Sequence, residues 1–163
     1  LGPYHFSRNM KRIIAYLLAI TALFGYLLSI PLRGLLPLWL ESYTIPYLCA
    51  TTGGFGGLVY CLRSVYLNAC VQGQWDMKWW PWYVIRPIVS TICGLVSFLF
   101  LKAGLLVLDA TQNSDGNHFG FFALAFIAGL NVDKFITKIE GIAQATWGID
   151  KSRTASKSED STR

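Results

Sequence analysis

Uncharged apolar runs divide the chain into pieces long enough to cross a membrane. The first run, from Ile13 to Ile30, is 18 residues long and would cover roughly 27 Å of hydrocarbon at about 1.5 Å per residue. Three further apolar runs follow it. The pattern therefore predicts four transmembrane helices, at residues 13–30, 46–62, 84–108 and from about 119 onward.

The last two runs have distinctive ends. Arg86 and Pro87 are predicted to open the third helix, because proline suits a first helical turn, where its missing N–H would be unpaired anyway. The fourth run meets Asn131, Asp133 and Lys134 after about a dozen apolar residues. Its inner end must therefore leave the hydrocarbon there.

Helix breakers interrupt the segment between the first two spans. Pro31, Gly34 and Pro37 stand among leucines and Trp39, and proline and glycine disfavour a continuous helix. Residues 31–46 are therefore expected either to lie along or dip into the far membrane interface, or to form a plain apolar loop.

After the fourth span the apolar residues recur at helical spacing, and polar residues fall on the opposite side of the predicted helix. We expect this amphipathic helix to continue the fourth span into the cytoplasm. Its apolar stripe must be covered by neighbouring subunits, by lipid headgroups or by a soluble partner. The candidate partner-docking residues are Phe135, Ile136, Ile139, Ile142 and Trp147.

Composition supports a lipid environment. Charged residues make up 14% of the chain and hydrophobic residues 53%, with a mean hydropathy of +0.43, whereas soluble domains carry about 25% charged residues. Disordered, collagen-like and disulfide-stapled classes are excluded by this hydrophobicity, by unperiodic glycines and by only four cysteines. The expected fold class is an all-α integral membrane protein with four transmembrane helices.

Basic residues are unevenly distributed among the predicted loops. Twelve of the 14 lysines and arginines fall before the first span, between the second and third, or after the fourth. The positive-inside rule then places both termini in the cytoplasm, so the net charge of +5 reports topology rather than nucleic-acid binding. The predicted organisation is a basic leader (1–12), one transmembrane domain (13–148) and a disordered polar tail (149–163).

Small residues recur at four-residue spacing inside the spans. Such small-xxx-small pairs make smooth helix faces that let another backbone approach closely. We expect helix packing, within or between protomers, at Gly53, Gly54, Gly57, Gly94, Ala125 and Gly129.

Two features near predicted span ends have alternative interpretations. The tryptophan-rich run before the third span could stack bases, but amphipathic rings at a membrane boundary are ordinary interface anchors. Lys102 would either extend its ammonium to the outer interface or lie on an ion pathway. The predicted anchors are Trp75, Trp79, Trp80, Trp82 and Arg86.

Residues for catalysis or metal binding do not converge in the sequence. His5 and His118 fall on opposite sides of the predicted membrane, and the four cysteines lack CxxC spacing. The cysteines, Cys49, Cys61, Cys70 and Cys93, are expected to be small apolar fillers. We therefore expect no enzyme, metal or cofactor.

Two segments resemble a known kind of protein. Residues 86–106, RPIVSTICGLVSFLFLKAGLL, and 121–140, FFALAFIAGLNVDKFITKIE, resemble small four-span membrane proteins of two-gene bacterial anti-phage defence systems, such as the Kiwa membrane component. The resemblance implies an oligomeric inner-membrane subunit that senses membrane disturbance and docks a soluble cytoplasmic effector.

Two functions follow as hypotheses. The first is a non-enzymatic homo-oligomeric scaffold or sensor, with a cytoplasmic docking face formed by the loop near residues 63–82 and the helix at 132–147. The alternative is a channel or small exporter subunit with a polar path. The residues lining such a path would be Thr51, Thr52, Ser90, Thr91 and Lys102.

Overall fold

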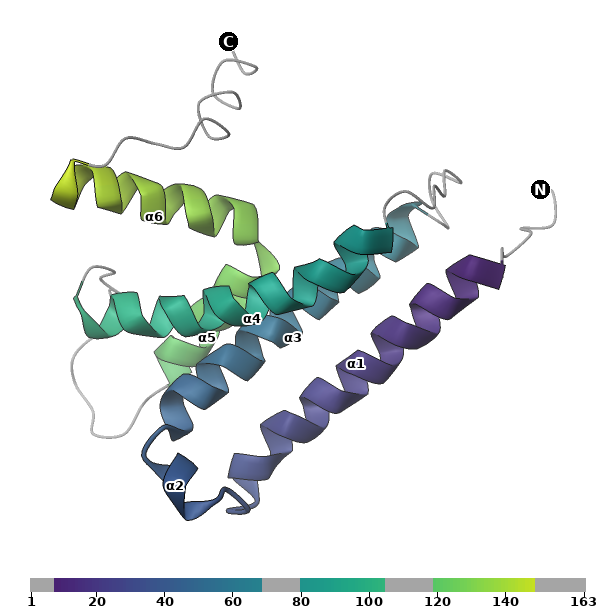
Figure 1. Cartoon of the computed structure of the whole chain (residues 1–163), viewed down its shortest axis with the longest axis horizontal. Helices are drawn as coiled ribbons and strands as arrows, with labels where there is room; N and C mark the ends of the chain where they lie inside the picture. The colour runs from purple at the N-terminus through teal and green to yellow at the C-terminus, as the bar shows by residue number, and fades with distance from the viewer. Residues whose placement is uncertain (1–7, 69–79, 105–118, 149–163) are drawn as a thin grey trace, which may run out of the picture.

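The computed structural model describes residues 8–68, 80–104 and 119–148 (Figure 1). These residues form helices joined by short turns, with no strand among them. The helices are α1 (Arg8–Leu32), α2 (Leu38–Glu41), α3 (Thr44–Tyr66), α4 (Trp80–Lys102), α5 (Phe119–Leu130) and α6 (Val132–Trp147). Outside the described residues lie His5, Cys70, Trp75, Trp79, His118, the first part of the leader, the predicted end of the third span and the polar tail.

Three of these helices, α1, α3 and α4, are long and apolar enough to cross a membrane. α5 has only 12 residues, or about 18 Å of helix, which is too short to cross hydrocarbon about 30 Å thick. It reaches the required length only together with α6. The all-helical class is thus confirmed, and three candidate spans, or four if the α5–α6 pair counts as one, fit a membrane protein.

The expectation that α6 continues the fourth span is wrong. α5 and α6 meet at an angle of 110° across Asn131, so α6 turns away from the direction of α5 and lies to one side of α4 (Figure 1). Asn131 begins α6, and its carbonyl accepts the Phe135 N–H at 2.9 Å. The polar residues that interrupt the apolar run therefore start a new helix in a new direction.

The start of the third span also needs correction. α4 begins at Trp80, so Pro87 is the eighth residue of the helix and not part of its first turn. The helix continues through the proline, and Tyr83, Pro87 and Ser90 are all buried on one side of it. α3 is likewise longer than predicted at both ends.

α3 lies at the centre of the packing, in contact with α1, α4 and α5. Figure 1 shows α1 beside α3, with α4 and α5 on the other side. One core cluster joins α1 to α3 and α4, and a second joins α4, α5 and the start of α6. The buried residues of the first are Ile13, Leu17, Leu58, Cys61, Val65 and Tyr83, and those of the second are Cys93, Ala128 and Val132.

The outward faces of the helices are apolar, as expected for contact with lipid. On α4 the exposed side chains recur at helical spacing and form one continuous stripe. Its members are Ile85, Ile88, Ile92, Leu95 and Leu99. The polar and small residues Arg86, Ser90, Gly94 and Ser97 of α4 are buried instead, which is the arrangement that a helix in hydrocarbon requires.

The segment between α1 and α3 is a turn and one short helix. Gly34, with φ +66°, follows the end of α1, and this left-handed conformation favours glycine. In α2, Leu38 is 88% and Trp39 74% exposed, so these side chains do not fold back onto the bundle. Within residues 31–46 the structure thus has a turn and a short helix with exposed apolar side chains, and both the interfacial segment and the plain loop stay predictions.

Candidate functional site

Three glycines hold α3, α4 and α5 in backbone contact. A Cβ atom built on Gly53 of α3 would lie 2.6 Å from the Gly94 Cα atom of α4, and one built on Gly129 of α5 would lie 2.8 Å from the Gly53 Cα atom. No side chain fits at such separations. The structure thus places these three predicted packing residues at one junction within the protomer.

Polar contacts reinforce this junction. The Ser90 hydroxyl of α4 is fully buried and donates to the Gly129 carbonyl of α5 at 3.0 Å. Gly57 faces Ser90, while Gly54 faces Phe24 and the Thr91 hydroxyl. Because the serine needs a glycine opposite it, the helix spacing and the hydrogen bond depend on each other.

Sequence reasoning missed one glycine of this junction. A Cβ atom on Gly56 would collide with the Phe126 carbonyl and lie 3.1 Å from the Leu130 nitrogen. Thr52 lies four residues before Gly56, so the small-xxx-small spacing includes this glycine, but the pair was not selected. Its place in the GGFGG cluster was the available signal. Ala125, which the rule did select, is fully buried.

A charged centre lies beside the junction. Arg86 was expected among the interface anchors, yet the structure buries it to 7% exposure. Its Nη1 atom donates to the Asp133 carboxylate of α6 at 3.1 Å, and the Asp133 side chain is 82% exposed. Burying a guanidinium in a membrane protein is costly unless it is paired. Asp133 supplies that pairing from the first turn of α6.

Two aromatic rings complete the surroundings of Arg86. Its guanidinium carbon lies 4.7 Å from the Tyr60 ring centroid and 5.4 Å from that of Trp82. Both separations are within cation–π range. The Arg86 Nε atom is buried and has no hydrogen-bond partner in the part of the chain that the structure describes. The two rings therefore stabilise the Arg86 guanidinium, whose hydrogen bonding is incomplete.

The centre lies near one end of the bundle. Arg86 is six residues beyond the start of α4 and Tyr60 six residues before the end of α3, which places both about 9 Å from those helix ends. The ends of α3 and α4 lie side by side in Figure 1. A charged pair at this level fits the boundary of the hydrocarbon, where the cost of burial is lower than at mid-membrane.

The candidate docking residues of α6 divide into two groups. Phe135 is half-buried and packs against the Cys93, Ala128 and Val132 cluster, so part of its side chain is already engaged within this chain. Ile139 and Ile142 are half-buried. Two side chains remain clearly exposed, Ile136 at 42% and Trp147 at 60%.

The remaining site residues lie at helix ends. Lys102 is the last residue of α4 and is exposed, about 22 Å along the helix from Pro87. Trp80, half exposed, opens the same helix. Trp82 was expected as an anchor and instead packs inward against Tyr60 and Tyr83, with ring centroids 5.8 and 5.1 Å apart.

No other chemical centre is apparent in the described ranges. They contain no group of three or more metal-ligating side chains. Cys49, Cys61 and Cys93 are buried free thiols, and the two histidines lie outside these ranges. The described thiols therefore fit the expected role of small core side chains.

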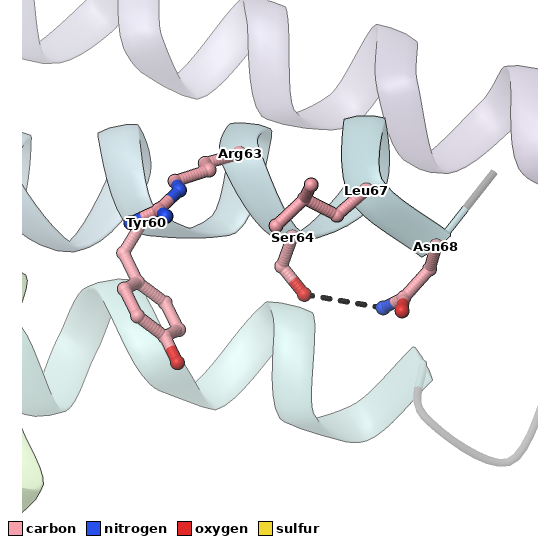
Figure 2. Close-up of a pocket in the computed structure, with 5 residues that line it drawn as sticks. All are labelled: Tyr60, Arg63, Ser64, Leu67 and Asn68. Atoms are coloured by element: carbon pink, nitrogen blue, oxygen red, sulfur yellow. Dashed lines mark hydrogen bonds between the residues drawn. The ribbon is translucent and has the colours of Figure 1, made fainter. Parts of the chain in front are cut away.

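An open pocket of about 240 Å³ adjoins the charged centre. It is lined by one face of the end of α3 and of the two residues that follow it (Figure 2): Tyr60, Arg63, Ser64, Leu67 and Asn68. The Asn68 amide donates to the Ser64 hydroxyl at 3.3 Å, and that hydroxyl lies 3.3 Å from the Tyr83 hydroxyl of α4. Tyr60 belongs to both the pocket and the surroundings of Arg86.

No protein-family model, curated protein or solved structure matches this chain. Its function is therefore argued from the geometry above and from the resemblance of its two quoted segments.

Proposed function

We propose that this chain is a non-enzymatic membrane subunit that acts as a sensor or scaffold and presents α6 to a cytoplasmic protein partner. The observation that carries this proposal is the Arg86–Asp133 pair. It joins the interior of a membrane-spanning helix to the first turn of a helix that leaves the bundle at 110°. A change in the packing of the spans would act on α6 through this pair.

The arrangement of α6 supports a role in docking. Three residues hold its first turn. Val132 is buried in the core, Asp133 forms an ion pair with Arg86, and Phe135 packs against residues of α4 and α5. Beyond that turn Ile136 and Trp147 stay exposed on one edge of the apolar stripe. Exposed anchors of this kind on an amphipathic helix are typical of surfaces that bind another helix or a groove.

The channel alternative has less support from the same contacts. Three of the hydroxyls expected to line a path are engaged with helix carbonyls: Thr51 with Tyr47, Ser90 with Gly129 and Thr91 with Pro87. A hydroxyl that already donates to a backbone carbonyl in a packed junction is poorly placed to coordinate a permeating ion. We therefore assign these residues to helix packing.

The biological setting of the proposal has separate support. A bacterial inner membrane, self-assembly and a part in anti-phage defence follow from the resemblance of residues 86–106 and 121–140 to membrane components of defence systems. The cytoplasmic location of α6 follows from the distribution of basic residues. In this proposal the spans respond to membrane disturbance and the partner carries out the response.

Photo-crosslinking in membranes of cells expressing the full chain tests the docking face. A photoreactive amino acid at Ile136 or Trp147 should give a discrete adduct with a soluble protein, identified by mass spectrometry. The matched control is the same amino acid at Leu95, 40% exposed on the lipid-facing stripe of α4, which should give only lipid adducts.

Two results would count against the docking function. The first is the absence of protein adducts at both α6 positions. The second is an ion flux in proteoliposomes that Lys102→Ala removes, combined with α6 adducts no different from those at Leu95. That combination would favour the channel.

A further inference from the structure

The pocket at the end of α3 is polar, basic and open. The residues that line it follow one another at helical spacing on a single face between Tyr60 and Asn68. Figure 2 shows the Tyr60 ring, the Ser64 hydroxyl and the Asn68 amide turned to the same side of α3, toward α4. Among the residues that the structure describes, none of those lining the pocket carries a carboxylate.

The pocket offers unused hydrogen-bond donors. Among the described residues, neither the Arg63 guanidinium nor the Tyr60 hydroxyl has a hydrogen-bond or ion-pair partner. The Asn68 amide uses one of its two hydrogens on Ser64. A guanidinium with free N–H groups beside a hydroxyl and an amide matches the oxygens of a phosphate group.

Size limits the ligand. At about 240 Å³ the pocket is smaller than the roughly 300 Å³ at which sites for whole small molecules begin. It would accommodate a phosphate group and the atoms linked to it, but not a nucleotide. Leu67, 36% exposed, adds an apolar edge against which a hydrocarbon chain can lie.

The level of the pocket in the bundle matches the lipid headgroups. Arg63 lies one turn closer to the α3 end than Tyr60, which neighbours the buried charge of Arg86. Ile13 of α1 packs with Val65 of α3, so the exposed Lys11 and Arg12 lie at a similar level. This end of the bundle therefore carries a basic belt, on the side predicted to be cytoplasmic.

We propose that the pocket lined by Tyr60, Arg63, Ser64, Leu67 and Asn68 binds a phosphate group, with the headgroup of an anionic phospholipid as its source. Arg63 binds the phosphate oxygens beside the Tyr60 hydroxyl, and the Asn68 amide donates to oxygens farther along the headgroup. Leu67 contacts the glycerol and the start of an acyl chain. Because Tyr60 also stacks on Arg86, bound lipid would rest against the charged centre.

Native mass spectrometry of the purified full-length chain in detergent tests this site. Phosphatidylglycerol, cardiolipin and phosphatidylcholine are added separately, and the retained lipid is counted per chain. We expect one anionic lipid to be retained in preference to phosphatidylcholine. Arg63→Gln should weaken retention by about tenfold, since it removes charge-assisted hydrogen bonds. Arg33→Gln is the matched control, because Arg33 is also exposed but lies in the turn after α1.

Competition with inorganic phosphate identifies the source of the group. If millimolar inorganic phosphate displaces the lipid from the wild-type chain, the ligand is a soluble phosphate compound, and the lipid assignment is overturned while the phosphate site stands. If the lipid stays bound, a headgroup is the ligand. If Arg63→Gln does not fold, Asn68→Leu, which removes the amide, is used as the pocket variant in the same experiment.

The proposal fails if either pocket variant retains anionic lipid as the wild type does. It fails equally if Arg33→Gln loses as much lipid as Arg63→Gln, because binding would then depend on general surface charge. Neither result would bear on the docking face of α6, which the crosslinking experiment tests separately.

Discussion

At the scale of single residues, Arg86 is the most demanding position in the chain. A buried guanidinium needs a charge partner and a surface on which its flat face can lie, and Asp133 with Tyr60 and Trp82 supplies both. A lysine could take the charge but not the stacked, planar geometry. The residue type therefore follows from the shape of its surroundings.

Glycine 53 provides the sharpest residue-scale prediction. In Gly53→Ala the new methyl group would meet the Gly94 Cα atom and the Ser90 carbonyl within 3 Å, which forces α3 and α4 apart. Overpacking of this kind costs about 1–3 kcal/mol or more. We expect a clear fall in the melting temperature of the detergent-solubilised protein, measured by size-exclusion chromatography after heating.

The control for this change is Gly25→Ala in α1, where nothing lies within 4 Å of the added Cβ atom. Alanine is favoured over glycine in a helix by about 0.5–1 kcal/mol, so this variant should melt at or above the wild-type temperature. Equal melting of Gly53→Ala and the wild type would show that α3 and α4 are not in backbone contact.

At the scale of elements, the decisive feature is the sharp turn between α5 and α6. Backbone hydrogen bonds do not set its angle, because α6 starts afresh at Asn131. The angle depends on contacts made by the first turn of α6, above all the Arg86–Asp133 pair and the packing of Val132 and Phe135. We therefore expect the orientation of α6 to depend on this ion pair.

Spin labels on two elements test this dependence. With labels at Leu95 on α4 and Trp147 on α6, both exposed, double electron–electron resonance should give a narrow distance distribution. Asp133→Asn should broaden it, because the neutral amide no longer balances the buried guanidinium charge. The matched control is Lys134→Gln, which changes an exposed charge in the same turn. An unchanged distribution in Asp133→Asn would mean that apolar packing alone orients α6.

At the scale of the whole molecule, burial is shared unequally among the helices. The span-forming window of α3 is 44% buried, that of α4 33% and that of α1 only 11%. α3 carries the glycines and touches three neighbours, whereas α1 packs along α3 and otherwise exposes leucines. A membrane is the environment in which such exposed faces are stable.

Reporter fusions test the orientation of the whole chain. A reporter placed after Arg163, or between Gln74 and Lys78, should report the cytoplasm, because these regions carry the basic residues. A reporter within Asn113–Gly116 should report the opposite side. Cytoplasmic signals at all three places would mean that α4 and α5 do not carry the chain across and back.

The sequence by itself determined the membrane class, the positions of the three long apolar helices and the residues suited to close helix packing. These features depend on neighbours within a few turns, such as the uncharged run of Ile13–Ile30 or the spacing of Gly53 and Gly57. The length of an apolar run and its helical period are enough to predict these features. Every backbone group in hydrocarbon must be paired, and a helix pairs these groups within its own segment.

The tertiary structure alone decided the inward position of Arg86, the direction of α6 and the pocket beside Tyr60. Arg86 and Asp133 are 47 residues apart in the chain, and no local pattern indicates that they meet. A pattern of apolar residues shows which face of a helix avoids water, but lipid and protein satisfy that requirement equally well. The choice between them is made by the contacts of helices distant in sequence, here by the glycine junction that brings α3, α4 and α5 together.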